Sequence, residues 1–477
     1  MQRNLRMYGI GALLLCAQLL AAPARGQERS PAATRAAEVV ALINSGDQAA
    51  ARRYVDEVYS DSFKAFAPME RHLGVFSMMR AQTQGLRVER ITEPGPGRAD
   101  VLARSELTEQ WFQFGFEVDT IPPHRINGFR IRPTAAPPER APAVPATDEE
   151  RARALEAYVR RIAAADAFSG VVLLAKNGRP LMSAAYGDAN KEPRRANAME
   201  TAFNLASVNK MITAVAVAQL VEAGKLSFDD PLAKFLPGFP NPRAAQEIRI
   251  KHLLSHTSGL GSYLGAGISG SRAGTVDEMM RFATDTATAF APGTRWRYSN
   301  TGFLVLGRVI EKVSGQSYFD YVRDHVYRPA GMTATEAHPK DRIPATAAIG
   351  YERGAAGYRS HVEALPFRGG PAGGGYATAG DLLRFAEALR TGKLVSPAMV
   401  RVLTTPKPEL SSPEYGYGFT TDAPGRVGHS GGYEGTSNNV DIFLDSGYTA
   451  IVLSNYGTSA RTISERMRTL VGARPAP

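Results

Sequence analysis

Ser207 and Lys210 could act as a nucleophile and its base, because they stand three residues apart at the start of a segment with helical periodicity. Residues at i and i+3 share a helix face, so an unprotonated Lys210 could accept the Ser207 proton as the hydroxyl attacks a carbonyl carbon. Apolar residues recur from Met211 to Val221 before Gly224, which predicts an amphipathic helix with Ser207 in its first turn. Because such a pair also arises by chance about once in a chain of this composition, it needs partners.

A second motif, Tyr298-Ser299-Asn300, is the one Tyr-x-Asn sequence in the chain. A tyrosine near a lysine can relay a proton, and an asparagine can hold both a substrate amide and the lysine. The structural alternative is a packed aromatic residue that follows Trp296. The motif therefore gains its chemical meaning only if the fold brings it to Ser207.

A third motif begins at His429 and includes Gly431 and Gly432, before an alternating strand pattern over 440–444. Glycines here would let a substrate backbone lie against an edge strand. The backbone N–H of Gly432 could then join that of Ser207 in an oxyanion hole. The alternative is an ordinary glycine-rich turn before a strand.

The order and spacing of these motifs resemble the penicillin-recognising serine hydrolases, a superfamily of class C β-lactamases, D-alanyl-D-alanine carboxypeptidases and family VIII-type carboxylesterases. Segments 250–260 and 373–382 are similar to the family's in the same order, and the resemblance runs from about 152 to 470. It implies Ser207 as nucleophile, Lys210 as its base partner and Tyr298 as proton relay toward the leaving group.

The resemblance also assigns the substrate-binding and oxyanion positions. Asn300 would hydrogen-bond substrate and lysine, and the amides of Ser207 and Gly432 would form the oxyanion hole, beside His429 and Gly431. Many relatives carry lysine where this chain has His429, and Lys-Thr-Gly is usual in the β-lactamases. His-x-Gly is more similar to certain carboxypeptidases and general serine hydrolases, which weakens a β-lactamase interpretation.

Three other chemistries fit the sequence less well. Ser430 stands in a G-x-S-x-G pattern, but no histidine follows His429 to complete the chain order of an α/β-hydrolase. His252 and His256 have helical spacing, yet Leu253 occupies the glutamate position of a zincin, so we interpret them as a helix end packed near the catalytic lobe. The glycines of 369–375 lack the P-loop ending. We therefore predict no metal and no cofactor.

The first 26 residues are typical of a secretory signal peptide. Arg3 and Arg6 flank the start of an apolar run over 7–20, and small residues follow at 22–24. Cleavage would remove Cys16, the one cysteine, and an exported chain without disulfides favours the bacterial periplasm or exterior. The run is short for a membrane span, so the mature protein is not expected to be transmembrane. The formal net charge of +10 is scattered, which disfavours a nucleic-acid partner.

Composition predicts two folded domains after the signal peptide. Residues 133–148 contain five prolines and no apolar periodicity, as expected for a semi-rigid linker. Before it, 27–132 combines helical patterning with strands and resembles, loosely, a cystatin-like or nuclear-transport-factor-like module. This small α+β unit has no nucleophile and base pair, so docking, dimerisation, substrate binding and a purely structural role all stay open.

Residues 149–477 form the predicted catalytic domain. Asn177-Gly178 indicates a hairpin between 171–176 and 179–185, a second hairpin joins 440–444 to 449–453, and 461–471 reads as a closing helix. Strands at both ends with helices between them predict an antiparallel sheet built from early and late sequence. The fold class is therefore mixed α+β, and the family fold adds a helical lobe that carries the Tyr-x-Asn loop.

The predicted function is acyl transfer by an exported serine hydrolase. A serine acyl-enzyme would form on an amide or ester of a small-molecule or peptide substrate: a D-alanyl peptide, a D-amino-acid derivative or a β-lactam, with peptidoglycan as one candidate source. A carboxylesterase for small esters is an alternative, and a penicillin-binding or cell-wall-sensing module without turnover is another. No glutamate stands where a deacylation base can be assigned, so the deacylation rate is left open.

Overall fold

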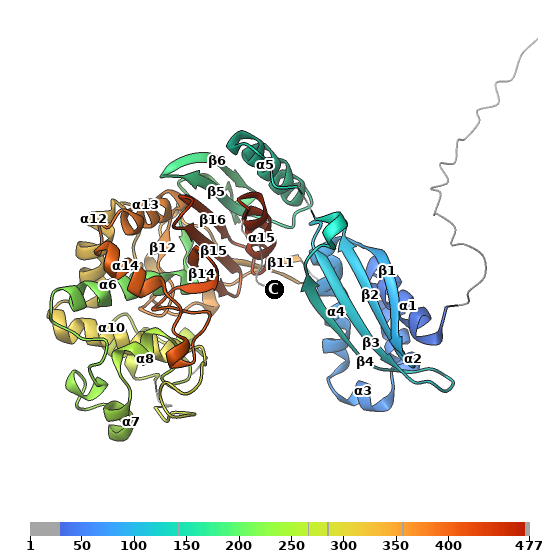
Figure 1. The fold of residues 1–477 in the computed structure, drawn as a ribbon, viewed down its shortest axis with the longest axis horizontal. Coiled ribbons are helices and arrows are strands. Elements are labelled where there is room, and N and C mark those ends of the chain that lie inside the picture. Colours follow the sequence, from blue (N-terminus) through green and yellow to red (C-terminus); the bar gives the residue numbers. More distant parts are fainter. Residues whose placement is uncertain (1–28, 142, 266, 284–285, 355–356, 473–477) are drawn as a thin grey trace, which may run out of the picture. The chain divides into compact units, whose positions relative to one another are not determined.

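The computed structural model describes residues 29–141, 143–265, 267–283, 286–354 and 357–472. The predicted signal peptide, with Cys16, lies outside the described residues. The chain divides into two compact units: unit 1 comprises Met1–Ser77, Val88–Ala103 and Gln113–Arg132, and unit 2 comprises Met78–Arg87, Arg104–Phe112 and Pro133–Pro477 (Figure 1). The assignment of 27–132, 133–148 and 149–477 as domain, linker and domain stays a prediction.

The N-terminal region places a run of helices before a four-stranded sheet. Its elements are α1 (Pro31–Ser45), α2 (Gln48–Val58), α3 (Asp61–Ala65), α4 (Met69–Thr83), β1 (Leu86–Gly95), β2 (Arg98–Ser105), β3 (Trp111–Val118) and β4 (Ile126–Thr134), with sheet order β1-β2-β3-β4. Phe114 and Phe116 of β3 are buried on one face, while the alternate residues Gln113 and Gly115 are only half-buried. This alternation explains why one face of the sheet packs into a core.

Unit 2 is built on a six-stranded antiparallel sheet with the order β13-β14-β15-β16-β5-β6. These strands are β5 (Gly170–Lys176), β6 (Arg179–Tyr186), β13 (Thr420–Ala423), β14 (Arg426–Tyr433), β15 (Thr436–Phe443) and β16 (Tyr448–Ser454). Early β5 pairs with late β16, with Leu173 opposite Ile451, so the predicted sheet of early and late sequence is confirmed. Asn177 and Gly178 turn between β5 and β6 with φ of +48° and +73°, the positive values that a two-residue hairpin loop needs.

Helices cover both faces of this sheet (Figure 1). On one face, α5 (Asp148–Ala164) and α15 (Ala460–Leu470) pack on Val172 and Leu174, whose side chains are almost fully buried. On the other face, Val171 and Leu173 belong to the core shared with the helical lobe. Successive β5 residues thus serve two different cores.

The helical lobe and short strands complete unit 2. They are β7 (Asp188–Lys191), β8 (Arg194–Ala196), β9 (Phe203–Asn204), α6 (Asn209–Glu222), α7 (Pro242–Glu247), α8 (Ile250–Leu254), α9 (Val276–Met280), α10 (Asn300–Ser314), α11 (Tyr318–Val322), α12 (Arg328–Ala330), β10 (Tyr351–Gly354), β11 (Gly357–Ser360), β12 (Tyr376–Ala377), α13 (Ala379–Arg390) and α14 (Pro397–Thr404).

Helix α6 differs from the amphipathic helix that its sequence predicted. Every residue from Asn209 to Ala218 is buried, because the helix passes through the core and touches α10, α11, α14 and β14. It ends at Glu222, and Gly224 follows with φ of +67°. The small side chains Ala214, Ala216 and Ala218 suit a helix that is enclosed on all sides.

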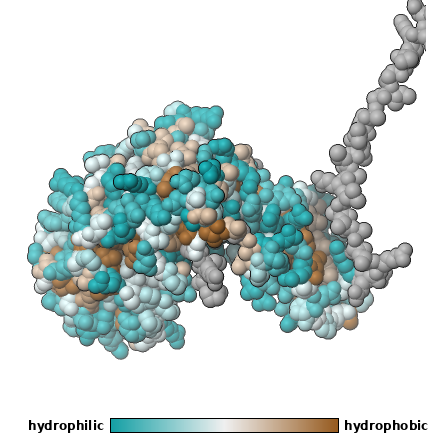
Figure 2. Space-filling view, turned by 45° about the horizontal axis from the view of Figure 1, so that its top comes forward, coloured by the Kyte–Doolittle hydropathy of each residue, from teal (hydrophilic) through white to brown (hydrophobic). Residues whose placement is uncertain are grey.

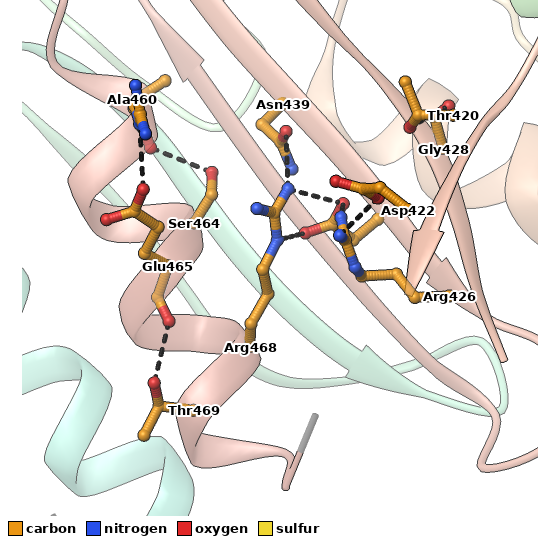
Figure 3. A network of polar contacts seen from close by, with 12 residues as sticks. Thr420, Asp422, Arg426, Gly428, Asn439, Ala460, Ser464, Glu465, Arg468 and Thr469 are labelled. Atoms are coloured by element: carbon orange, nitrogen blue, oxygen red, sulfur yellow. Dashed lines mark hydrogen bonds and ion pairs between the residues drawn. The ribbon is translucent and has the colours of Figure 1, made fainter. Parts of the chain in front are cut away.

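A buried ion cluster fastens α15 to the sheet (Figure 3). The carboxylate of Asp441 on β15 accepts hydrogen bonds from Arg426 of β14 at 3.0 Å and from Arg468 of α15 at 2.7 Å. The Asp441 side chain is 1% exposed, so the two guanidinium groups replace its lost hydration. Asp422 pairs with Arg426 from the more exposed side.

The surface seen in Figure 2 is mostly hydrophilic or intermediate, and its hydrophobic residues form separate patches. Most apolar side chains of each unit are accordingly packed in its own interior. Within the ranges that the structure describes, none of the helices is both long and apolar enough to cross a membrane.

Candidate active site

Ser207 lies in the 3-10 turn η2 (Ala206–Val208), two residues before α6 begins at Asn209, and not in the first turn of the helix as expected. The preceding residue, Ala206, has φ of +46°, a left-handed conformation that a non-glycine residue adopts only at a cost of order 1 kcal/mol. Its N–H donates to Asn204 Oδ1 at 2.9 Å, and its carbonyl accepts from Gly374 N–H at 3.0 Å. These bonds hold a sharp turn that places Ser207 just before the N-terminal end of α6.

Lys210 is buried beneath this turn with 0% of its surface exposed. Its Nζ lies 3.2 Å from Ser207 Oγ and 2.9 Å from Asn300 Oδ1, and it also contacts the carbonyl oxygen of Ala372. Burial lowers the pKa of Lys210 well below its usual value. Its recorded partners in the described part of the chain are all neutral, so no opposite charge offsets the lost hydration.

The three contacts of Lys210 match the hydrogen-bonding capacity of a neutral amine. A neutral amine has two N–H donors and one lone pair, and Asn300 Oδ1 and Ala372 O are both acceptors. The lone pair is then left for the hydroxyl of Ser207. This arrangement suits a base that removes the serine proton.

Tyr298 forms a hydrogen bond with Ser207, and burial raises its pKa to about 12, so it is a neutral phenol near pH 7. Its ring centroid lies 4.8 Å from Lys210 Nζ. The next residue, Ser299, caps α10 by accepting from Gly302 N–H at 2.9 Å and donates to Gly261 O at 2.8 Å. The middle residue of the Tyr-Ser-Asn motif thus fixes the turn that aims Tyr298 and Asn300 at one point.

Strand β14 lies against the turn that carries Ser207. A Cβ atom on Gly431 would stand 2.3 Å from Leu205 O, so only glycine allows this approach, whereas a Cβ on Gly432 would meet nothing within 4 Å. The fold therefore packs Gly431 against the turn that carries Ser207 and leaves open space at the Cα of the next residue, Gly432. That their amides form the oxyanion hole stays a prediction.

His429 is buried in the same cluster, with its ring 6.4 Å from that of Tyr298. Its Nδ1 is paired with the carbonyl of Ser430, and its Nε2 lies 2.9 Å from the hydroxyl of Tyr415. Because a carbonyl only accepts, Nδ1 carries the proton and Nε2 accepts from Tyr415. Burial lowers the pKa of His429 to about 3, so the ring is neutral near pH 7 and presents no positive charge.

Sequence reasoning had not placed two residues of the site, His256 and Tyr415. His256 follows α8 with φ of +60°, and its ring lies 4.3 Å from Tyr298 and 4.7 Å from Tyr415. Its Nδ1 accepts from Ser299 N–H at 3.1 Å, and burial lowers its pKa well below the usual value. The family resemblance over 250–260 was the one sequence signal for His256. No sequence signal indicated the contacts of Tyr415 and Ala372.

The structure also shows where the residues of the rejected alternatives lie. Ser430 lies exposed within β14 opposite Asn439, and not on the strand-to-helix turn of a nucleophile elbow. His252 caps α8, where its Nδ1 accepts from Arg249 N–H at 3.2 Å. Among the residues whose positions are described, no group of three or more His, Cys, Asp or Glu could hold a metal ion.

Comparisons with known proteins match the larger part of the chain. The sequence model of the family described as "Beta-lactamase" matches residues 155–473. A putative penicillin-binding protein, PbpX, of Bacillus subtilis (strain 168) is 33% identical over 317 residues, covering 65% of this chain and 76% of the relative. Esterase EstB of Burkholderia gladioli is 33% identical over 337 residues, covering 60% and 85%.

The fold has a matching solved structure. The crystal structure of a penicillin binding protein from Bacillus halodurans superposes with a TM-score of 0.59 at 29% identity. The match covers 68% of this chain and 99% of that protein.

Proposed function

This chain belongs to the beta-lactamase family and is a serine hydrolase, and on that premise we propose that Ser207, Lys210 and Tyr298 carry out its chemistry through a covalent acyl-enzyme. The observation that carries the proposal is the buried Lys210 amine. Its two donors are used by Asn300 and Ala372, and its Nζ lies 3.2 Å from Ser207 Oγ. A neutral amine at that distance is a general base for the hydroxyl.

Acylation follows from these contacts. Ser207 Oγ bonds to the substrate carbonyl carbon while its proton moves to Lys210 Nζ, and the negative oxygen is stabilised by the N–H groups of Ser207 and Gly432. The carbon–heteroatom bond then breaks, and the leaving alcohol or amine takes a proton from the Tyr298 hydroxyl, which Lys210 reprotonates. The high pKa of Tyr298 keeps the phenol available as this donor.

Deacylation uses the same groups in reverse. A water molecule takes the place of the leaving group near Tyr298, gives its proton through the phenol to Lys210, and attacks the ester carbon. The ester bond breaks, Lys210 returns the proton to Ser207, and the carboxylic acid product leaves. The site is then restored without a further reactant.

The neutral His429 bears on the choice of substrate. A lysine at this position could pair with a substrate carboxylate, whereas the His429 ring is uncharged and both its nitrogens have partners within the protein. The predicted range of substrates covers D-alanyl, D-amino-acid and β-lactam compounds as well as small esters. Within it, we expect the enzyme to favour esters and amides that carry no carboxylate near this strand. An esterase among the relatives supports the same class.

Export to the periplasm or exterior is part of the proposal and rests on the apolar run over 7–20. A cell fractionation experiment tests it, with the full chain and a chain that lacks 1–26. We expect only the full chain to leave the cytoplasm, and equal distribution of the two would contradict export.

The hydrolase activity is tested with p-nitrophenyl acetate, p-nitrophenyl butyrate and a chromogenic penicillin. We expect turnover of the esters by the wild type, a much lower rate on the penicillin, and no rate above background for Ser207→Ala. The proposal fails if Ser207→Ala hydrolyses the esters as fast as the wild type, or if the wild type hydrolyses none of the three.

A further inference from the structure

One residue, His256, bonds the backbone on both sides of Tyr298. Its carbonyl oxygen accepts a hydrogen bond from the N–H of Arg297 at 2.9 Å, and its ring Nδ1 accepts one from the N–H of Ser299 at 3.1 Å. Arg297 and Ser299 are the two neighbours of Tyr298 in the chain. The same residue therefore holds the backbone of Tyr298 from both directions.

The His256 ring also packs against the side chain whose backbone it holds. Its centroid lies 4.3 Å from that of Tyr298 and 5.1 Å from that of Phe303. His256 is 0% exposed, so a substrate in the site cannot touch it. Any effect of His256 on the reaction must pass through its neighbours, and of these Tyr298 is the one that bonds Ser207.

The bond to Ser299 requires one form of the imidazole. A backbone N–H only donates, so Nδ1 carries the lone pair and Nε2 carries the hydrogen. Burial lowers the pKa of His256 well below its usual value, which keeps the ring neutral and Nδ1 an acceptor. Nε2 has no hydrogen-bond partner among the residues whose placement is described, so within them the Ser299 amide orients the ring.

The backbone conformation of His256 makes this double contact possible. Its φ is +60°, in the left-handed region that residues other than glycine adopt with strain. In this conformation its carbonyl and its side chain bond two amides that stand two residues apart, at 297 and 299. Asparagine enters this region more readily than most residues, and its side-chain oxygen is attached at the same place as Nδ1.

We propose that His256 is a positioning residue for Tyr298, and that its Nδ1 holds the phenol where it can protonate the leaving group. The inference rests on the proposed function, because it needs Tyr298 to be the proton relay. Without the acceptor, the buried Ser299 N–H loses its partner and the segment around Tyr298 is free to shift. A displacement of about 1 Å in an active site can cost about 10²-fold in rate.

The test compares two esters of the same acid, p-nitrophenyl butyrate and ethyl butyrate, by kcat/KM, which reports acylation. The p-nitrophenolate ion is stable and leaves without a proton, whereas the ethyl oxygen must be protonated as its bond to carbon breaks. The ratio of the two constants, p-nitrophenyl over ethyl, therefore measures the proton relay. Both constants come from one sample, so the ratio does not depend on the fraction of the protein that is folded.

The two substitutions at His256 separate its ring from its acceptor. His256→Phe keeps an aromatic ring and removes the acceptor, so we expect the ratio to rise by about tenfold. His256→Asn keeps the acceptor and should keep the wild-type ratio. Tyr298→Phe should raise the ratio by about 10²-fold. His256→Phe added to Tyr298→Phe should raise it no further, because substitutions that act through one group are not additive.

His252→Phe is the matched control, because Nδ1 of this buried histidine also accepts a backbone N–H, that of Arg249, at 3.2 Å. It should leave the ratio as in the wild type. A wild-type ratio in His256→Phe overturns the inference, as does an equal rise in His256→Asn or a double variant in which the two single effects multiply. An unchanged ratio in Tyr298→Phe would instead overturn the relay of the proposed function, and the inference with it.

Discussion

Two buried polar clusters beside strand β14 are of opposite kinds. In the first, Asp441 of β15 is enclosed with Arg426 and Arg468, so each buried charge has an opposite charge within hydrogen-bonding distance (Figure 3). In the other cluster, Lys210 of α6 is equally buried, but its contacts are a hydroxyl, an amide oxygen and a carbonyl oxygen. No opposite charge compensates its burial among the residues that the structure describes, which favours the neutral amine.

This difference distinguishes a buried charge with a structural role from a buried amine with a chemical role. A paired buried charge is stable in one protonation state and fixes the packing of α15 on the sheet. An unpaired buried lysine gives up its proton readily, which is what a general base near pH 7 must do. Strand β14 thus lies beside both a structural ion cluster and a reactive site, and substitutions in the two clusters should have different consequences.

The largest expected effect is on turnover when Lys210 is changed to arginine. Guanidinium stays protonated at accessible pH and cannot accept the serine proton, so we expect kcat for p-nitrophenyl acetate to fall by about 10⁴-fold, equivalent to about 5.5 kcal/mol. Raising the pH to 9 should not restore it. A loss of less than tenfold, measured from initial rates, would show that Lys210 is not the base.

Substitutions in the ion cluster around Asp441 should change the stability of the protein. Asp441→Asn leaves Arg426 and Arg468 without their buried carboxylate, so we expect the free energy of unfolding to fall by about 3–5 kcal/mol in urea. Asp422→Asn is the control, because its side chain is 40% exposed and the change should cost less than about 1 kcal/mol. Equal costs for the two substitutions would contradict the comparison. The folded fraction of each should keep the wild-type kcat.

Tyr298→Phe removes the proposed proton relay and leaves the ring in place. We expect a loss of about 10²-fold or more in kcat. Tyr415→Phe removes a hydroxyl from a neighbouring buried tyrosine that bonds His429, and we expect it to lose less than about tenfold in kcat. If both variants slow turnover equally, Tyr298 acts only through packing.

The buried histidines predict a smaller effect that depends on pH. The folded-state pKa is lowered to about 3 for His429 and to about 4 for His252, below the usual 6.5. Below pH 6.5 the unfolded chain binds protons that the folded protein does not, so stability is lost as pH falls from 6.5 toward 4. We expect a loss of about 1–2 kcal/mol per histidine at pH 5 relative to pH 7.5, measured by urea unfolding. Equal stability at the two pH values would refute this.

Local sequence rules were sufficient for several features. Asn177-Gly178 predicted its hairpin, because the required positive φ values belong to those residue types. The spacing of Ser207 and Lys210 predicted their contact, which depends on one helical turn. Strand signals at both ends of the catalytic domain, with helical segments between them, predicted the antiparallel sheet of early and late sequence.

Features that depend on distant packing escaped those rules. Helix α6 is enclosed on all sides, since α10, α11, α14 and strand β14, all distant from it in the sequence, pack against it. Ser207 precedes the helix because Asn204 and Gly374 hold Ala206 in a left-handed turn. The small pocket lined by Asn204, His361 and Asn455 joins segments more than 200 residues apart, so no local pattern could reveal it.

The most direct test of the central claim is the mass of the protein during turnover. The wild type and Ser207→Ala are mixed with a p-nitrophenyl ester or a fluorescent penicillin, quenched in acid within seconds, and examined by intact mass and peptide mapping. We predict one acyl group on the peptide that contains Ser207 in the wild type and none in Ser207→Ala. An acyl group on Ser430 or elsewhere, or the same adduct in Ser207→Ala, would contradict the account.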